Sequence, residues 1–153
     1  MNQQYGEIVK QTILNYCKQY YKEYNLVENT TNDIDLVHKQ TKQKERLIGT
    51  FHLVGELFKF NLVDCFVIEK YINLLLNKLK QTSKVKLTME IKLREQYIEC
   101  LREFIKKVNS KLSQTKKDDI LKKVTILLDD KKEHSFTFSC REQFMFMDII
   151  DLF

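Results

Sequence analysis

The chain has 153 residues, a length that fits one domain with a core of moderate size. It contains no proline and only three glycines, so its composition excludes a turn-rich β protein and predicts an all-α fold. The net charge is +5, and no apolar run is long enough to cross a bilayer. The first twenty residues are polar and contain no signal-peptide core, so secretion is not expected.

The first helix is expected at about residues 5–24, where apolar side chains recur at helical spacing. The following segment, 25–41, is rich in Asn, Thr and Asp and lacks this periodicity, which predicts a mobile loop. The stripe expected to be buried on the first helix consists of Val9, Ile13, Tyr16, Cys17, Tyr20 and Tyr24.

A second helix is expected at about 42–60 and a third at about 64–80. Because only residues 61–63 separate them, the two helices should form an antiparallel hairpin. Their expected buried stripes are Leu47, Phe51, Val54 and Phe58 on the second, and Val67, Tyr71, Leu74 and Leu75 on the third.

A basic linker, 81–87, precedes a fourth helix at about 88–109. Two capping boxes, Thr115–Asp118 and Ser139–Glu142, predict where the fifth and sixth helices begin. The expected buried residues are Tyr97, Leu101, Phe104 and Val108, then Ile120, Val124, Leu127 and Leu128, and finally Phe144, Met147, Ile150 and Leu152. Consecutive hairpins with short links are typical of a HEAT-like α-solenoid.

Positive charge is concentrated in residues 78–123, which carry fourteen basic and six acidic side chains. A polyanion such as messenger RNA is a natural partner for such a segment, and a solvated helix surface explains the same lysines equally well. The candidate RNA-binding residues are Lys78, Lys80, Lys84, Lys86, Lys116, Lys117, Lys122 and Lys123.

Catalytic patterns are nearly absent, so we predict that the protein is not an enzyme and uses no cofactor. The helical glycines are not followed by the Lys-Ser or Lys-Thr step of a phosphate-binding loop. The three histidines have no second ligand one turn away, so no metal site is expected. The four cysteines, Cys17, Cys65, Cys100 and Cys140, are dispersed among apolar neighbours and are expected to be buried, reduced thiols of a cytoplasmic protein.

Residues 46–60 contain a Gly55-Glu56 step directly before Leu57-Phe58-Lys59. This string resembles the signature helix of the middle domain of eukaryotic translation initiation factor 4G, a stack of HEAT-type helical hairpins. Four further segments resemble that family in the same order, and they are residues 13–22, 64–76, 97–102 and the closing helix 139–152.

The resemblance covers the second half of the family domain, so it implies a half-domain over residues 1–153. It further implies a scaffold that binds the DEAD-box RNA helicase initiation factor 4A and promotes its activity. By the logic of the family, the contacts would come from hairpin turns and from the exposed flank of the last helix. The residues implied are Lys59, Phe60, Asn61, Lys106, Asn109, Arg141 and Asp148, whereas Leu57, Phe58, Phe104 and Phe144 are expected in the core.

One short motif, Tyr21 followed by Leu26 and Val27, is similar to peptides that dock on the cap-binding protein, initiation factor 4E. Two other functions are compatible with the sequence. One is a middle-domain relative that acts in messenger RNA decay or splicing, and the other is a basic helical RNA-binding module. The Gly-Glu-Leu-Phe-Lys string and the closing Asp-Ile-Ile-Asp-Leu favour translation initiation.

Overall fold

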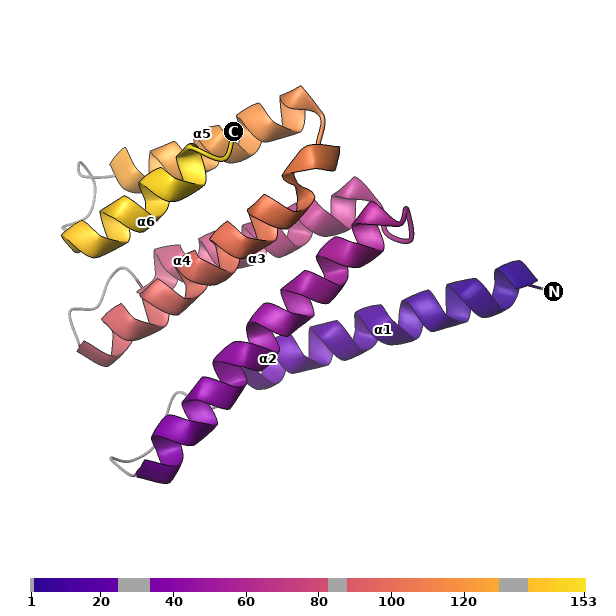
Figure 1. Ribbon diagram of the computed structural model, residues 1–153, viewed down its shortest axis with the longest axis horizontal. Coiled ribbons are helices and arrows are strands. Elements are labelled where there is room, and N and C mark those ends of the chain that lie inside the picture. The colour runs from indigo at the N-terminus through magenta and orange to yellow at the C-terminus, as the bar shows by residue number, and fades with distance from the viewer. Residues whose placement is uncertain (1, 25–33, 83–87, 130–137) are drawn as a thin grey trace. The chain divides into compact units, whose positions relative to one another are not determined.

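The computed structural model describes residues 2–24, 34–82, 88–129 and 138–153, which form helices and no strand (Figure 1). The elements are α1 (Asn2–Tyr24), α2 (Ile34–Lys59), α3 (Cys65–Thr82), α4 (Thr88–Val108), a 3-10 turn η1 (Asn109–Lys111), α5 (Gln114–Asp129) and α6 (Cys140–Ile150). The all-α prediction is therefore confirmed. The helices group into two compact units, an N-terminal unit (Met1–Asp64) and a C-terminal unit (Cys65–Phe153). The extent of the domain stays a prediction.

In the N-terminal unit, α1 packs against α2. The stripe predicted on α2 is confirmed, since Leu47, Phe51 and Val54 are all buried, as is Phe58. On α1 the prediction is correct for Cys17, which is buried, but wrong for Val9 and Tyr16, which are exposed, and it missed the buried Leu14. Ile13 is half-buried, and the side chains of Tyr20 and Tyr24 lie outside the described residues. Within this unit α1 has one helical neighbour, so only a narrow face, at i and i+3, is covered.

Helix α2 begins at Ile34, well before the expected start at Lys42. The predicted loop is therefore wrong for residues 34–41, while residues 25–33 lie outside the described part of the chain. The physical reason is composition. Residues 38–46 contain no glycine or proline and are mostly Lys, Gln, Glu and Arg, which favour helix without any apolar periodicity.

A Schellman motif ends α2. Asn61 has a φ of 59°, its N–H donates to the carbonyl of Phe58 at 3.0 Å, and the N–H of Leu62 donates to the carbonyl of Leu57 at 2.8 Å. Asparagine and glycine tolerate this left-handed conformation better than other residues. Asn61 therefore shapes the turn in which it lies.

We expect Asn61→Val to lower the free energy of unfolding by about 1–2 kcal/mol, because a β-branched residue is strained at positive φ. Asn61→Gly should leave the stability nearly unchanged, since glycine adopts this conformation without a steric penalty. Urea denaturation of both variants measures the difference. Equal destabilisation by valine and glycine would contradict the backbone role and indicate that the amide side chain matters instead.

The C-terminal unit contains two stacked hairpins, α3–α4 and α5–α6, with α4 against α6 and α3 against α5 (Figure 1). Helix α4 is central, and its predicted stripe of Tyr97, Leu101, Phe104 and Val108 is completely buried. On α3 the buried residues are Ile68, Tyr71, Ile72, Leu75, Leu76 and Leu79, whereas Val67 and Leu74 are only half-buried. Helix α5 buries Ile120, Val124 and Leu127 as expected, and Leu128 is half-buried.

The start of α5 differs from the prediction. The helix begins at Gln114, so Thr115 lies inside the first turn and the expected Thr115–Asp118 capping box is wrong. The Ser113 carbonyl accepts from the N–H groups of Lys116 and Lys117, and Asp118 accepts from the Gln114 side chain at 2.9 Å. A serine two residues upstream therefore occupies the N-cap position.

The Ser139–Glu142 capping box at the start of α6 is confirmed. The face of α6 that is buried was predicted wrongly, however. Phe144 and Met147 are 67% and 52% exposed, and the buried residues are Glu142, Phe146 and Ile149. The reason is that the buried face includes a charged residue, Glu142, which a search for apolar stripes passes over.

Candidate protein-interaction surfaces

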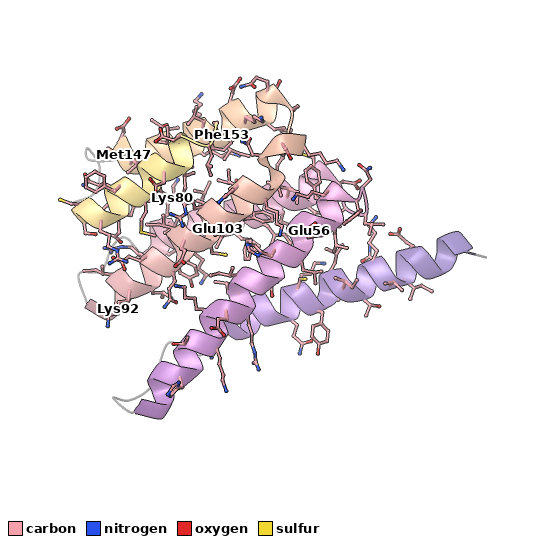
Figure 2. The ribbon with its side chains drawn as sticks, in the orientation of Figure 1. Glu56, Lys80, Lys92, Glu103, Met147 and Phe153 are labelled. Carbon is pink, nitrogen blue, oxygen red and sulfur yellow. The ribbon has the colours of Figure 1, made fainter. Side chains whose placement is uncertain are left out.

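The turn that ends α2, residues 59–62, projects an aromatic side chain. Phe60 is 72% exposed and Leu62 is 48% exposed. Lys59 is exposed beside it and forms an ion pair with Glu56 at 3.7 Å (Figure 2). Asn61 holds the turn through its backbone, as described above. An exposed aromatic and a lysine on a fixed turn are thus the elements of this surface that can contact another molecule.

Lys106 lies in the last turn of α4 and is exposed, and Asn109, directly after this helix, is half-buried. The Asn109 side chain donates a hydrogen bond from Nδ2 to the backbone carbonyl of Leu152. This bond ties the 3-10 turn after α4 to the end of the chain that follows α6. Of the two residues, Lys106 is available to a partner, while Asn109 joins two segments of the C-terminal unit.

Arg141 and Asp148 on α6 are both exposed, and each forms an ion pair with α4. Arg141 Nε lies 3.4 Å from Glu95 Oε1, and Asp148 Oδ2 lies 3.2 Å from Arg102 Nη1. These pairs hold two opposite charges in place along the flank of α6. They leave 77% of the Arg141 side chain and 58% of the Asp148 side chain accessible.

Beneath this flank lies a buried ion pair that sequence analysis did not find. Arg94 of α4 donates to Glu142 of α6 in two hydrogen bonds, Nε to Oε1 at 2.7 Å and Nη2 to Oε2 at 3.2 Å. Both side chains are almost fully buried. Arg94 also donates to the carbonyl of Thr82, in the last turn of α3, at 3.3 Å. A single guanidinium therefore connects three helices.

The segment before α6 completes this cluster. Glu142 Oε2 accepts from the N–H of Ser139 at 2.7 Å, and the Ser139 hydroxyl accepts from the Glu142 N–H at 3.2 Å. The Phe138 ring lies 5.9 Å from the Arg94 guanidinium and packs edge-on against Phe146. The sequence does contain one signal for this buried pair. At helical spacing, Glu142 shares a face with Phe146, and Arg94 shares a face with Ile98 and Leu101.

The lysines of the basic segment differ in their exposure and in their contacts. Lys116 of α5 forms an ion pair with Glu69 of α3, and the hydrogen bond to Glu69 raises the pKa of this lysine. Lys123 of α5 pairs with Asp119 at 2.7 Å and donates to Asn73 of α3 at 3.3 Å. Lys80 and Lys122 are exposed, and Lys78 and Lys117 are half-buried. Lys84 and Lys86 lie outside the described residues.

The structure thus has a helical hairpin architecture and exposes a candidate surface in each unit. A family model described as the MIF4G domain matches residues 1–153. The chain belongs to the MIF4G domain family. This match confirms the resemblance to the middle domain of initiation factor 4G. No curated protein and no solved structure gave a significant match to the chain.

MIF4G domains are helical scaffolds that mediate protein and RNA interactions in translation or messenger RNA decay. This assigns the chain to translation-related or other messenger RNA-related assemblies. No helix among the described residues is long and apolar enough to span a membrane. Nor do the described residues contain a group of three or more His, Cys, Asp or Glu side chains that could hold a metal ion.

The cysteines of this MIF4G domain differ in their surroundings. Cys17 and Cys100 are buried as predicted, and burial raises the pKa of each thiol. The prediction is wrong for Cys140, which is exposed, and for Cys65, which is half-buried and donates to Glu69 at 3.8 Å. Both residues occupy the first position of a helix, α3 or α6, where the chain enters from a turn and fewer neighbours cover the side chain.

The motif predicted to bind initiation factor 4E falls mainly outside the described residues. Leu26 and Val27 follow the end of α1, and the side chain of Tyr21, within α1, is also undescribed. The motif stays a prediction.

Proposed function

We propose that this MIF4G domain is a cytoplasmic translation-initiation scaffold that binds the DEAD-box helicase initiation factor 4A and promotes its activity. The proposal is supported by the family match over residues 1–153 together with the Gly-Glu-Leu-Phe-Lys string of α2. A role in messenger RNA decay or splicing is the alternative within the same family. The closing Asp-Ile-Ile-Asp-Leu string favours initiation.

The observation that carries a protein-binding role is the exposed Phe60 on the turn of residues 59–62. Exposed aromatic side chains on rigid supports supply large contact areas, and such residues dominate the energetics of interfaces. The Schellman motif at Asn61 fixes this turn, so little conformational entropy is lost on binding. Lys59 adds a charge that would steer an acidic partner surface.

The flank of α6 supplies a second candidate surface in the C-terminal unit. Arg141 and Asp148 are held by α4, so each presents its charge in a defined position. Lys106 is a further candidate contact. Asn61 and Asn109, which the family resemblance also implied, are assigned positioning roles because their hydrogen bonds or backbone conformation shape the turns.

Titration calorimetry of the chain into initiation factor 4A, with RNA and a non-hydrolysable nucleotide, tests the proposal. We expect Phe60→Ala to weaken binding about tenfold or more, because a central aromatic contact contributes more than 1 kcal/mol. Lys59→Glu should weaken binding several-fold, through a lower association rate. The controls are Ile126→Ala, an exposed apolar residue on α5, and Lys42→Glu, an exposed lysine on α2.

Equal losses in the two controls would contradict a specific contact at residues 59–62. A complete lack of helicase binding, combined with salt-sensitive binding to RNA, would support the basic RNA-binding module in place of the scaffold.

RNA binding by the basic segment is a compatible second proposal, supported by the exposure of Lys80 and Lys122. Lys116 and Lys123, which pair with Glu69 and Asp119, are less exposed than Lys80 and Lys122 and are therefore weaker candidates. If Lys80 and Lys122 contact phosphates, replacing both with glutamine should reduce the slope of log affinity against log salt by about 1.4 for single-stranded RNA. An unchanged slope would contradict this assignment.

Docking of initiation factor 4E at Tyr21, Leu26 and Val27 is proposed on sequence alone, and Leu26→Ala should abolish it.

A further inference from the structure

An open groove runs between α1 and α2 in the N-terminal unit, with a volume of about 350 Å³. Its lining consists of Thr12, Ile13, Tyr16 and Cys17 from α1 and Arg46, Gly49, Thr50 and Leu53 from α2. The hydroxyls of Thr12 and Thr50 donate to the backbone carbonyls one turn before them, each at 2.8 Å. Both threonines therefore present little polar surface, and the groove is apolar apart from the guanidinium of Arg46.

The floor and flanks of the groove are open to a neighbouring molecule. A Cβ atom built on Gly49 would meet no other atom within 4 Å, so the space above this residue is empty. Ile8, Val9, Tyr16 and Leu53 are all more than two-fifths exposed. Exposed apolar side chains that gather on one surface favour coverage by another molecule, and Ile8, Tyr16 and Leu53 line the two hollows described here.

The groove continues along α1 toward the start of the chain. A second hollow, lined by Glu7, Ile8, Gln11, Thr12 and Asn15, shares Thr12 with the first. One hollow therefore carries an acid, Glu7, and the other carries a base, Arg46, while the small residue Thr12 lines both. Glu7 is exposed and lies 3.4 Å from Lys10, a separation that permits exchange of partners at a surface site.

We propose that the occupant of this groove is the same surface of a second copy of the chain. An interface with two-fold symmetry requires a patch that is complementary to itself. Antiparallel pairing of α1 about Thr12 meets this requirement, because Ile8 of one copy then lies opposite Tyr16 of the other. Glu7 of one copy then lies opposite Cys17, which lines the groove together with Arg46.

Two features favour this pairing over coverage by an unrelated protein. The two Glu7–Arg46 contacts are equivalent by symmetry, so one favourable charge pair is formed twice. Thr12 at the centre and Gly49 on the floor are small, which permits close approach of two helices. The buried surface comes from about three turns of α1 and part of α2, less than the roughly 800 Å² per partner of a standard interface, so the expected dissociation constant is micromolar or weaker.

Sedimentation equilibrium of the full chain over a concentration series tests this inference independently of the helicase proposal. We expect a reversible monomer–dimer equilibrium. Glu7→Lys and Arg46→Glu should each raise the dissociation constant about tenfold, since two attractive pairs become two repulsive ones. The double variant Glu7→Lys/Arg46→Glu should restore it to within about threefold of the original value, because the charges are exchanged and not lost. Lys18→Glu, an exposed charge reversal on α1 outside the groove, is the matched control.

Cross-linking adds a readout that depends on the position of the symmetry axis. In a Cys140→Ser background, oxidation of Thr12→Cys should give a disulfide-linked dimer, whereas Lys18→Cys should not. A chain that is monomeric at millimolar concentration, or a double variant that is not rescued, would overturn the proposal. A monomeric chain whose helicase binding falls on Arg46→Glu would assign the groove to the helicase instead.

Discussion

Replacing Glu142 with glutamine is expected to lower the free energy of unfolding by about 3–5 kcal/mol. The substitution preserves the shape of the side chain but leaves the Arg94 guanidinium buried without its counter-charge. An uncompensated buried charge costs far more than the net contribution of the intact pair. Because domains of this size are stable by about 5–15 kcal/mol, the loss is a large share of the total.

Urea denaturation followed by circular dichroism measures this loss, and the same flank of α6 provides the control. Asp148→Asn removes an exposed partner of Arg102 and should cost less than about 1 kcal/mol. The double variant Arg94→Met/Glu142→Leu should recover most of the stability, since an apolar pair of similar volume replaces the ions. If Glu142→Gln were no more destabilising than Asp148→Asn, the buried ion pair would not be a main support of the C-terminal unit.

A second large effect on stability is expected for one of the two phenylalanines on α6 and not for the other. Phe146→Ala should destabilise the protein by about 3–5 kcal/mol, because this ring is fully buried and packs on Phe138. Phe144→Ala, two residues earlier, should change stability by less than about 0.5 kcal/mol, since Phe144 is mostly exposed. Thermal or urea unfolding of both variants decides which face of α6 is buried. A larger loss for Phe144→Ala would restore the face expected from apolar spacing.

The fold was largely predictable where packing follows apolar spacing. Helix α4 is buried between α3 and α6, so its stripe of Tyr97, Leu101, Phe104 and Val108 repeats at the expected interval and was predicted correctly. The same holds for Leu47, Phe51 and Val54 on α2. Along these stripes the buried side chains are apolar, so the spacing in the sequence matches the packing in the structure.

The remaining errors have physical causes. Helix α1 carries more apolar residues than one neighbouring helix can cover, so spacing predicted the burial of Cys17 but missed that of Leu14 and wrongly placed Val9 and Tyr16 in the core. On α6 the buried face contains Glu142, whose burial depends on Arg94, a residue distant in the chain. The start of α2 at Ile34 depends on intrinsic propensity in a polar segment, where no apolar pattern exists.

The candidate contact residues were named from family resemblance and not from geometry, and their role stays a prediction. The resemblance named seven residues, and the structure exposes Lys59, Phe60, Lys106, Arg141 and Asp148, which leaves them accessible to a partner. It could not show that Asn61 adopts a left-handed conformation or that Asn109 binds the backbone of Leu152. Those roles depend on how the chain closes its turns, and the identity of an asparagine does not reveal them.

The position of Arg94 has a consequence for folding. Its partners come from Thr82 in α3 and from Glu142 in α6, which is 48 residues further along the chain. Detachment of α3 breaks the first contact, detachment of α6 breaks the second, and detachment of α4 breaks both. We therefore expect α3, α4 and α6 to exchange their amide hydrogens in one concerted opening, although solenoids in general allow their repeats to unravel from an end.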